Sequence, residues 1–419
     1  MTTRNGRATL RDQIYDLLAP LKRKNDPANL SRRNQNVNRV MSRVLILSWD
    51  GGGNTPSAFN LGSRLARGGH RVRMMGWESM RGRAGTAGLE FTTYRSVAPW
   101  PAELRHEDGW DQIEVALFGP AVEADIAAEA ESFGADVLLV DCMLTAGHAA
   151  GYRLGLPVVS LVHVRYAPFV HGWGSRVLGT DIGAMLDAAQ CVLALQPPGF
   201  DPPELLGRGV TAVGAVLRPG TAETLDPATA TLLTTPGDPW VLLSLSTTLQ
   251  GQAQTLPGML DALGSLPVRV LLTLGGVLRP EAVPAPVNVT VRGYLSHESA
   301  LPHMSVVVTH AGMSTVATAL AAGLPMVCVP QGRDQPVNAE RVEELGAGLM
   351  IAADAPPGAL ANAVQHVLAN PHFRTTAQQL AAGAANVGNG QLAADLVESL
   401  IPLHITSPNS AGAGPTAHP

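Results

Sequence analysis

The 419-residue sequence predicts an α/β protein built from two doubly wound, parallel-sheet domains that face each other across a cleft. In both halves of the chain, short apolar runs alternate with helical segments, and strand–helix–strand spacing of this kind requires parallel strands. A stretch rich in Pro, Gly and Thr, residues 214–239, separates the two series and is typical of an interdomain linker. The chain is long enough for two cores, and a ligand is expected between the facing loops.

The two ends of the chain differ in composition from its middle. Residues 1–42 are polar and basic, and we interpret them as a disordered extension or as the result of a start codon placed too early, with Met41 as the alternative start. An arm that binds a membrane or a partner is the other interpretation. The predicted boundaries are an N-terminal domain at 43–215, a linker at 216–238, a C-terminal domain at 239–385, a helical segment at 386–403 that could cross back to the first domain, and a flexible tail at 404–419.

The composition argues against several classes of protein. The formal net charge of −5 argues against a nucleic-acid partner. No run of about 18 apolar residues is free of polar breaks, so stable membrane insertion is not expected, and the N-terminus lacks the apolar segment of a signal peptide. Cys142, Cys191 and Cys328 lie in or beside apolar runs without CxxC spacing, which predicts reduced core residues of a cytoplasmic protein.

The first half begins with the predicted strand Val44–Ser48, which a glycine-rich loop at 49–56 joins to a helix. This loop lacks the G-x-G-x-x-G spacing of a dinucleotide-binding turn, so a nicotinamide enzyme is not expected. Residues 168–179 are rich in glycine and aromatic side chains, and we expect them to form a loop over a pocket.

The stretch 306–348 organises the second half. It opens with an apolar run that ends at His310, and a break at Gly312 separates this run from a helix that begins near Ser314 and Thr315. Backbone N–H groups at such a helix start suit a diphosphate without a metal, because the helix end supplies positive potential. The alternative from the residues alone is a packed His310 beside an N-cap by one of the two hydroxyl residues.

A second polar loop in the same stretch ends in Asp334 and Gln335, just before a helix that Pro336 can start. A carboxylate beside an amide suits the hydroxyl groups of a polyhydroxylated ligand. The alternative is that Asp334 serves as the N-cap of the helix.

The residues of this stretch that follow a known pattern are His310, Gly312, Ser314, Thr315, Ala319-Leu320, Gly323-Leu324-Pro325, Pro330, Asp334-Gln335 and Asn338-Ala339. They resemble the donor-binding signature of the family 1 glycosyltransferases that use nucleotide sugars, and they are most similar to the bacterial antibiotic and macrolide enzymes. The resemblance extends from about Val44 to Leu400. It implies two Rossmann-like domains facing across a cleft, the GT-B fold.

The resemblance implies roles for the residues around the sugar diphosphate. His310 and the Gly312–Thr315 loop, Met313 included, would hold the diphosphate. Asp334 and Gln335 would bind hydroxyl groups of the donor sugar.

It also implies roles at the nucleotide end of the donor. Ser246 and Thr247 occupy the place of a Ser-containing loop that reaches the nucleotide. Tyr294 would flank the base, Leu295 would contact it through its backbone, and His297 would lie near the nucleotide. A packing role within the loop is the alternative for Tyr294 and His297.

One departure from the pattern concerns the ribose. The family often has a Glu eight positions after the signature histidine, where it binds both ribose hydroxyls, and this chain has Thr318 there. A ribose without the 2′-hydroxyl would not need that carboxylate. We therefore expect a dTDP-sugar at least as strongly as a UDP-sugar.

The acceptor side shows a second departure. Inverting transfer needs a base that takes the proton of the acceptor hydroxyl, and the family usually places a His three residues before a Pro in the loop after the first strand. Gly53 occupies that position, before Pro56, so the usual base is absent. The acidic partner of that base is present as Asp141, at the end of a predicted strand.

Four residues are candidates for the missing function. Asp141 could act as base or as orienting acid, and His163 also follows a predicted strand. Asp50 lies in the loop that lost the histidine, and His148 lies in the helix after Asp141, where it could simply face the core. Each candidate has the alternative role of a cap or a buried hydrogen-bonding group.

These features predict an inverting, metal-independent glycosyltransferase without a cofactor. It would move a hexose or deoxyhexose from a dTDP- or UDP-sugar to a hydroxyl of a small apolar natural-product acceptor. The alternatives are a nucleotide-sugar epimerase of the same fold and a non-catalytic helper or binding protein. Transfer to carbon also remains open, and the oligomeric state is not predicted.

Overall fold

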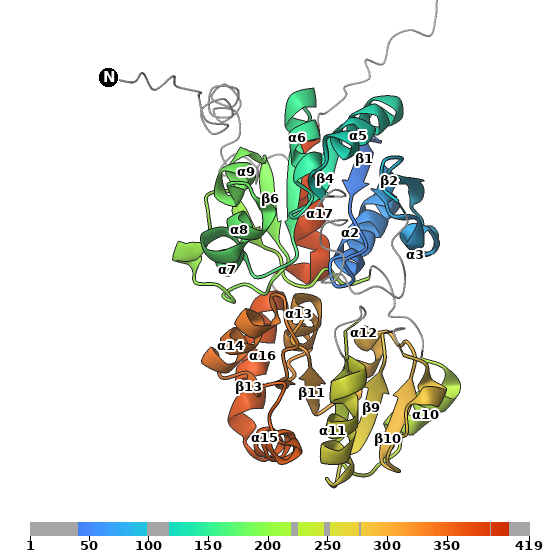
Figure 1. Cartoon of the computed structure of the whole chain (residues 1–419), viewed down its shortest axis with the longest axis vertical. Coiled ribbons are helices and arrows are strands. Elements are labelled where there is room, and N and C mark those ends of the chain that lie inside the picture. The colour runs from blue at the N-terminus through green and yellow to red at the C-terminus, as the bar shows by residue number, and fades with distance from the viewer. Residues whose placement is uncertain are drawn as a thin grey trace, which may run out of the picture.

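The computed structural model describes residues 41–98, 117–218, 225–246, 252–275, 278–385 and 387–401. Figure 1 shows two α/β lobes, and each lobe contains one sheet. All pairs of described strands are parallel, which confirms the predicted class of two doubly wound, Rossmann-like domains. Residues 1–40 of the predicted extension and the predicted tail at 404–419 lie outside the described residues.

The N-terminal sheet has seven strands in the order β3-β2-β1-β4-β5-β6-β7. Its central strands consist mainly of Val, Leu and Ile because helices cover both faces of a parallel sheet. The strand β3 was not predicted from the sequence. The strands are β1 (Arg43–Leu47), β2 (Arg71–Gly76), β3 (Glu90–Thr93), β4 (Val137–Asp141), β5 (Val158–Val162), β6 (Cys191–Ala194) and β7 (Val210–Ala212).

The C-terminal sheet has six strands in the order β10-β9-β8-β11-β12-β13. In both sheets the chain runs outward from one central strand and then returns to its other side, between β1 and β4 in the first and between β8 and β11 in the second. Ligands of such sheets bind beyond the strand ends at this switch point. The strands are β8 (Trp240–Ser244), β9 (Arg269–Thr273), β10 (Val289–Arg292), β11 (Val306–Thr309), β12 (Met326–Cys328) and β13 (Gly348–Met350).

The segment 168–179, predicted as a loop, is helical. Phe169 is fully buried and its ring centroid lies 5.0 Å from that of Trp173, so the aromatic side chains fold this segment onto the core. The helical elements of this domain are α2 (Thr55–Arg67), η2 (Glu78–Met80), α3 (Arg81–Thr86), α5 (Pro120–Phe133), α6 (Thr145–Leu154), α7 (Tyr166–Pro168), the π-helical turn η4 (Phe169–Trp173), α8 (Gly174–Leu178), α9 (Ile182–Ala188) and η5 (Pro203–Leu205).

The predicted linker at 216–238 contains a helix, α10 (Pro227–Thr234), that packs onto the C-terminal domain. The side chain of Asp226 caps it by accepting a hydrogen bond from the Thr229 N–H, and Leu233 is buried in the domain core. The other helical elements are α11 (Gln252–Gly264), η6 (Pro280–Ala282), α12 (His297–Ala300), η7 (Leu301–His303), α13 (Met313–Ala321), α14 (Gln335–Glu344), α15 (Pro357–Ala369), α16 (Pro371–Ala385), η8 (Gly388–Gly390) and α17 (Gln391–Leu400).

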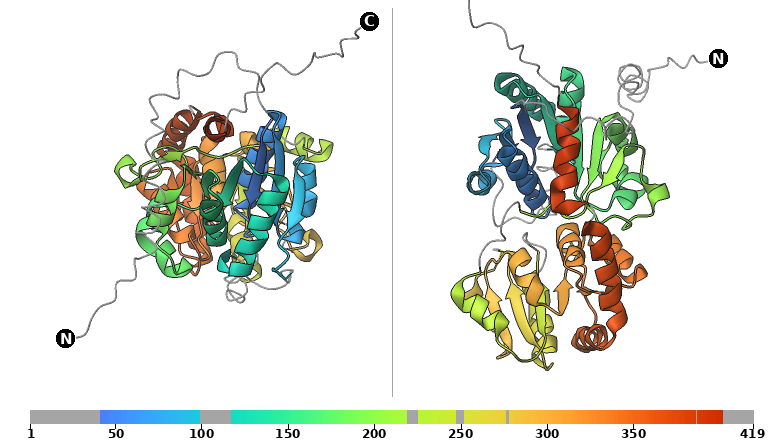
Figure 2. Two further views of the ribbon diagram at one scale, coloured as in Figure 1. Left: turned by 90° about the horizontal axis from the view of Figure 1, so that it is seen from above. Right: turned by 180° about the vertical axis from the view of Figure 1, so that it is seen from behind.

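The last helix, α17, packs into the N-terminal domain. Figure 2 shows it, in red, against the blue and green elements of the first lobe. Ala393, Ala394 and Val397 are buried in the same hydrophobic cluster as β1 and β4. The two domains are therefore joined twice by the chain, once before α10 and once before α17.

Two further expectations concern cysteines and membranes. Cys142, Cys191 and Cys328 are buried free thiols. Among the described residues, no helix combines the length and the apolar character needed to cross a membrane.

Candidate active site

Several of the predicted site residues follow strands at or next to the two switch points. Asp141 ends β4, beside the loop that follows β1, and His163 directly follows β5. In the C-terminal domain, His310 follows β11 and Ser246 lies two residues after β8. These positions are where a parallel sheet exposes polar groups without interrupting its hydrogen-bond ladder.

The centre of the candidate site in the N-terminal domain is a pair formed by Asp141 and His163. The Nδ1 atom of His163 lies 3.2 Å from Oδ2 of Asp141, and the carboxylate is almost fully buried. Because Nδ1 donates its hydrogen to the carboxylate, Nε2 is the atom of the ring that could take a proton from a substrate. The prediction that one of these two residues acts as base and the other as orienting group is thus geometrically possible.

Three further groups hold the carboxylate of Asp141. Trp49 donates through Nε1 to Oδ1 at 3.3 Å, and the backbone N–H of Met143 donates to the same oxygen at 3.0 Å. The amide of Asn54 donates to Oδ2 at 2.8 Å and also to the carbonyl of Trp49 at 2.9 Å. The loop after β1, which lost its histidine, is therefore still bonded to the acid through Trp49 and Asn54.

The interaction between the two side chains shifts the pKa of each in the direction that favours its charged form. Burial works against the imidazolium, but the adjacent carboxylate outweighs it and holds the pKa of His163 well above 6.5. Burial also opposes ionisation of Asp141, yet the charge of His163 and its hydrogen bonds hold the pKa of that carboxyl below its usual range. The pair thus favours the protonated imidazolium of His163, which must lose a proton before it can act as a base.

The other two base candidates have different partners. Asp50 forms a 2.6 Å ion pair with Arg83 and accepts a hydrogen bond from Ser79 at 2.7 Å, so its carboxylate is directed toward η2 and α3 rather than toward Asp141. His148 is fully buried between the Leu144 carbonyl and the Ser160 hydroxyl, and burial lowers its pKa to about 4. Its geometry fits the core role that the sequence left open.

The same region brings together a possible set of metal ligands. A carboxylate oxygen of Asp141, the Cys142 sulfur and a ring nitrogen of His163 lie within 4.8 Å of one another. However, the hydrogen-bond donors described above already surround the carboxylate, and burial raises the pKa of the Cys142 thiol, which disfavours a thiolate ligand. The group fits a hydrogen-bonded acid–base pair better than a metal centre.

On the donor side, the loop after β11 is shaped around the ring of His310. Nδ1 lies 3.5 Å from the Ser244 carbonyl, and burial lowers the pKa of His310 to about 4, so the ring is neutral. A Cβ atom at Gly312 would lie 2.6 Å from Nε2 of this ring, so only glycine leaves the ring room. Between them, Ala311 has a φ of 64°, a backbone conformation that L-residues rarely adopt and that is frequent at ligand-binding loops.

The start of α13 is suited to an anion. Gly312 is the N-cap, and no side chain of the described residues caps the helix, so the alternative of an N-cap by Ser314 or Thr315 does not hold. Both hydroxyl residues are partly exposed, whereas the side chain of Met313 is buried in the core, which leaves only its backbone N–H for a ligand. Uncapped N–H groups at a helix start attract phosphate.

Asp334 precedes α14 at the N-cap position, but its side chain does not cap the helix. Instead Oδ2 accepts a hydrogen bond from the Asn338 amide at 2.9 Å, and the same amide donates to the Ala311 carbonyl at 3.0 Å. Burial raises the pKa of Asp334. Gln335 is buried and its amide oxygen accepts from the Gln331 N–H at 2.7 Å, so in this structure it braces its own loop.

The predicted nucleotide end is only partly described. Ser246 is buried, and Thr247 lies outside the described residues. Tyr294 is 71% exposed and Leu295 is partly buried, which leaves both at a surface. His297 faces the Thr273 hydroxyl at 3.1 Å and burial lowers its pKa to about 4, in agreement with the packing alternative.

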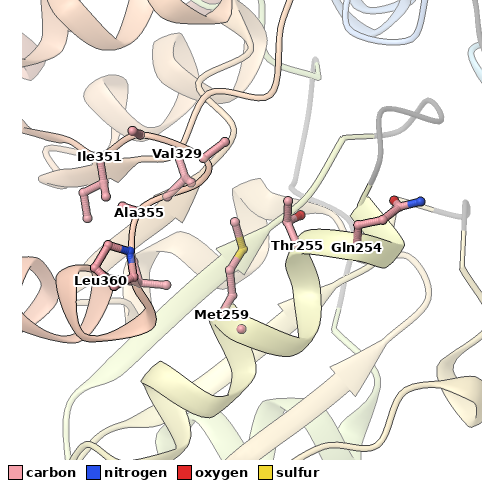
Figure 3. Close-up of a pocket in the computed structure, with 11 residues that line it drawn as sticks. Gln254, Thr255, Met259, Val329, Ile351, Ala355 and Leu360 are labelled. Carbon is pink, nitrogen blue, oxygen red and sulfur yellow. The ribbon is translucent and has the colours of Figure 1, made fainter.

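Two cavities lie near these elements. One, of about 50 Å³, lies between the domains, and Glu298, Ser314 and Thr318 are among the residues that line it. The other, of about 180 Å³, lies within the C-terminal domain between α11 and the segment that leads into α15, and Figure 3 shows Met259 and Leu360 among the side chains around it. None of the predicted site residues lines this second cavity, and its largely apolar lining does not suit a diphosphate.

Sequence reasoning missed the residues that position this site. Asn54 and Trp49 lie in the glycine-rich loop, and an amide next to a helix start was a usable signal there. Arg165 donates to the Val337 carbonyl at 3.0 Å, which joins the segment after His163 to α14. No local pattern indicates such a contact, because its partners are 172 residues apart.

Comparison with known proteins agrees with this geometry. Residues 258–400 match the family described as "Erythromycin biosynthesis protein CIII-like, C-terminal domain". The chain is 30% identical over 167 residues to demethyllactenocin mycarosyltransferase of Streptomyces fradiae. That alignment covers 39% of this chain, and it spans little more than a third, 36%, of the length of this curated relative.

Solved structures match over most of the chain. The glycosyltransferase of kitacinnamycin superposes with a TM-score of 0.69 at 25% identity, covering 87% of this chain and 100% of the other. The glycosyltransferase VinC, whose structure contains dTDP, superposes with a TM-score of 0.66 at 21% identity, covering 85% and 99%. The second match concerns the fold alone.

The fold and the two switch-point sites define a two-domain protein of the GT-B class. Within that class, residues 258–400 are similar to a C-terminal domain of macrolide-type glycosyltransferases, and most of the chain shares the fold of the kitacinnamycin glycosyltransferase.

Proposed function

We propose that the protein transfers a sugar from a nucleotide diphosphate to a hydroxyl group of a small acceptor, with inversion at the anomeric carbon. The observation that carries this proposal is the buried Asp141–His163 pair of the N-terminal domain, together with the uncapped start of α13 in the C-terminal domain. Arg165, two residues after His163, donates a hydrogen bond to the carbonyl of Val337, three residues after Asp334, at 3.0 Å. This contact supports a single site for the proposed base and the proposed sugar-binding carboxylate.

The proposed reaction has one proton transfer and one displacement. Nε2 of deprotonated His163 takes the proton of the acceptor hydroxyl, and its oxygen attacks the anomeric carbon. The bond from that carbon to the diphosphate oxygen breaks, and the electron pair leaves with the diphosphate. The N–H groups at the start of α13 stabilise the charge that develops on the leaving group, and Asp334 orients the sugar.

His163 takes over a function that the family usually assigns to the loop after the first strand. A Cβ atom at Gly53 would meet no atom within 4 Å, so the place of the usual histidine is open space. The carboxylate that would orient it is still present and bonded to His163 instead. In this proposal the acid has kept its position and the base has moved to the end of β5.

The donor is proposed to be a dTDP-sugar or a UDP-sugar, with dTDP at least as good. The hydroxyl of Thr318 donates to the Ser314 carbonyl at 2.7 Å, so this side chain does not replace a carboxylate at the ribose. The VinC structure, which has this fold, contains dTDP, and this supports a dTDP-sugar as the donor. The acceptor is proposed to be a small apolar natural product, in line with the named relative and with the family match.

A donor-by-acceptor screen with mass detection tests the proposal. We expect a new glycoside of an apolar acceptor from dTDP- or UDP-sugars, and a strong loss of product with Asp141→Asn. Conversion of the donor that does not depend on any acceptor would favour the nucleotide-sugar epimerase. Donor binding without turnover across the acceptor panel would favour the non-catalytic helper.

A further inference from the structure

Two arginines bridge the domains beside the proposed site. Arg165, which lies two residues after His163, donates through a terminal guanidinium nitrogen to the Val337 carbonyl of α14 at 3.0 Å. In the opposite direction, Arg341 of α14 donates through Nε to the Phe200 carbonyl at 2.5 Å. One helix of the C-terminal domain is therefore bonded at two points to loops of the N-terminal domain.

Arg165 is held rigidly on its own side of the boundary. Its Nε forms a 2.6 Å ion pair with Oδ1 of Asp201, and the two side chains are 12% and 0% exposed. The other oxygen of Asp201 accepts hydrogen bonds from the Ala167 N–H at 2.8 Å and from the Gln196 amide at 3.1 Å. An ion pair that is buried to this degree gains little net stability, because desolvation costs about as much as the attraction returns. Its contribution here is geometric, since it fixes the direction of the guanidinium.

The residue next to Asp201 anchors the same loop in the other domain. Phe200 is fully buried, and its ring belongs to the hydrophobic core of the C-terminal domain, although it lies between β6 and β7 of the N-terminal sheet. Asp201 thus orients Arg165 toward α14 while Phe200 inserts beneath it. Both bridges converge on this short loop.

The bridge at Val337 lies within the donor-side hydrogen-bond network. Val337 immediately precedes Asn338, whose amide links Asp334 to the Ala311 turn. A displacement of α14 therefore moves the proposed sugar and diphosphate sites together relative to His163. The hydrogen bond between Arg165 and Val337 links the segment that follows His163 directly to this network.

We propose that Arg165 is a positioning residue that sets the distance between the base at His163 and the donor bound against α14, with Asp201 as its orienting partner. The proposal rests on the function proposed above. Arg165 does not take part in proton transfer, and its effect passes through the placement of α14.

The test uses Arg165→Lys in the full-length protein, because lysine keeps the positive charge beside Asp201 but lacks the planar fork that reaches two acceptors at once. We expect kcat of transfer to fall about 10- to 100-fold, as a misplacement of about 1 Å can produce. The affinity for dTDP, measured by calorimetry, changes by less than about threefold, and the pH midpoint of kcat stays unchanged because the Asp141–His163 pair is intact. Hydrolysis of the donor increases relative to transfer.

Arg374→Lys is the matched control, because Arg374 also donates to a backbone carbonyl, that of Ser305, but within one domain. It should leave transfer unchanged. Hydrogen exchange supplies a readout that does not depend on activity: the amides of α14 should exchange faster in Arg165→Lys and not in Arg374→Lys.

Unchanged exchange of α14 in Arg165→Lys would overturn the positioning role, and so would a lower melting temperature with unchanged kcat. If the wild-type protein transfers no sugar at all, the proposed function fails, and the exchange experiment still decides whether Arg165 holds α14. The variant Asp201→Asn should reproduce the exchange result, which protects the conclusion if one variant folds poorly.

Discussion

The proposed donor wall, formed by the C-terminal domain, and the proposed acceptor wall, formed by the N-terminal domain, are assembled from the chain in different ways. His310, Gly312, Asp334 and Asn338 of the donor wall come from one continuous stretch, and its helix starts and turns are local structure. The acceptor wall instead joins the ends of three strands: Trp49 and Asp141, which are in hydrogen-bond contact, are 92 residues apart. Because the acceptor wall is assembled from several strands, a different strand can supply its base while the carboxylate of Asp141 stays in place.

The largest expected effect comes from removing the proposed base on the acceptor wall. His163→Ala should lower kcat of transfer about 10²- to 10⁴-fold, because a general base contributes about that much to proton transfer. Binding of dTDP should not change, since the ring does not belong to the donor wall. The measurement is steady-state transfer together with calorimetry, and His372→Ala on α16 is the control. Retention of more than about a tenth of the activity would contradict the assignment.

The acid of the same wall should control the pH dependence. In the wild type, kcat/KM should rise with pH through a midpoint well above 6.5, because only neutral His163 can accept a proton. In Asp141→Asn the ion pair is lost and burial alone remains, so the midpoint should move to lower pH while the maximal rate falls about 10- to 100-fold. A pH–rate profile checks this, and an unmoved midpoint would exclude His163 as the titrating group.

The same pair has a consequence for stability. Because the folded-state pKa of His163 is raised, its contribution to folding is fully present below the unfolded value of about 6.5 and is lost as the pH rises through the folded value. Unfolding experiments at several pH values should therefore show the wild type losing its advantage over His163→Ala in the alkaline range.

A smaller effect is expected on the donor wall. In Gly312→Ala the new Cβ atom would lie 2.6 Å from Nε2 of His310, so the ring must move away from the diphosphate site. We expect dTDP to bind about tenfold more weakly, which corresponds to about 1.4 kcal/mol. Gly358→Ala on α15, where a Cβ atom meets nothing within 4 Å, should leave binding unchanged. Equal affinities in calorimetry would show that the ring position does not matter to the ligand.

The smallest effect concerns the nucleotide. Wild-type turnover with dTDP- and UDP-linked forms of one sugar should differ by no more than a few-fold in favour of UDP, since Thr318 offers no carboxylate to a 2′-hydroxyl. Thr318→Glu should raise the use of the UDP-sugar relative to the dTDP-sugar by roughly threefold, the value of about one modest hydrogen bond. A strong UDP preference in the wild type would contradict the expectation for the donor.

The contrast between the walls also explains what could be predicted from the sequence. The parallel sheets and most helices followed from apolar runs and from Gly and Pro positions, because these signals are local. The strand β3 and the helix α10 did not follow, since both depend on packing against distant elements. The segment 168–179 was predicted as a loop over a pocket because glycine and aromatic residues occur in it together, whereas its aromatic residues pack it onto the core as helical turns.

The two walls of the site also differ in how far their residues could be predicted from the sequence. The residues of the donor wall were proposed from one motif, and the structure places His310 beside Gly312 and the start of α13. On the acceptor wall, Asp141 and His163 were two of several candidates, and only the fold brings them within 3.2 Å. Asp50 satisfied the same loop criterion, but its partner Arg83 could not be foreseen without the fold.

The position of α17 has a consequence for the order of folding. Its residues Ala393, Ala394 and Val397 complete a core that also contains β1, and the entire C-terminal domain lies between the two in the chain. The N-terminal domain therefore lacks part of its core until the C-terminal domain has been made, whereas the C-terminal domain can close earlier. Contacts of such long sequence separation slow folding and leave apolar surface exposed while the ribosome is still at work. A chain cut short before α17 would consequently lose the acceptor domain, although the cut lies far from it in sequence.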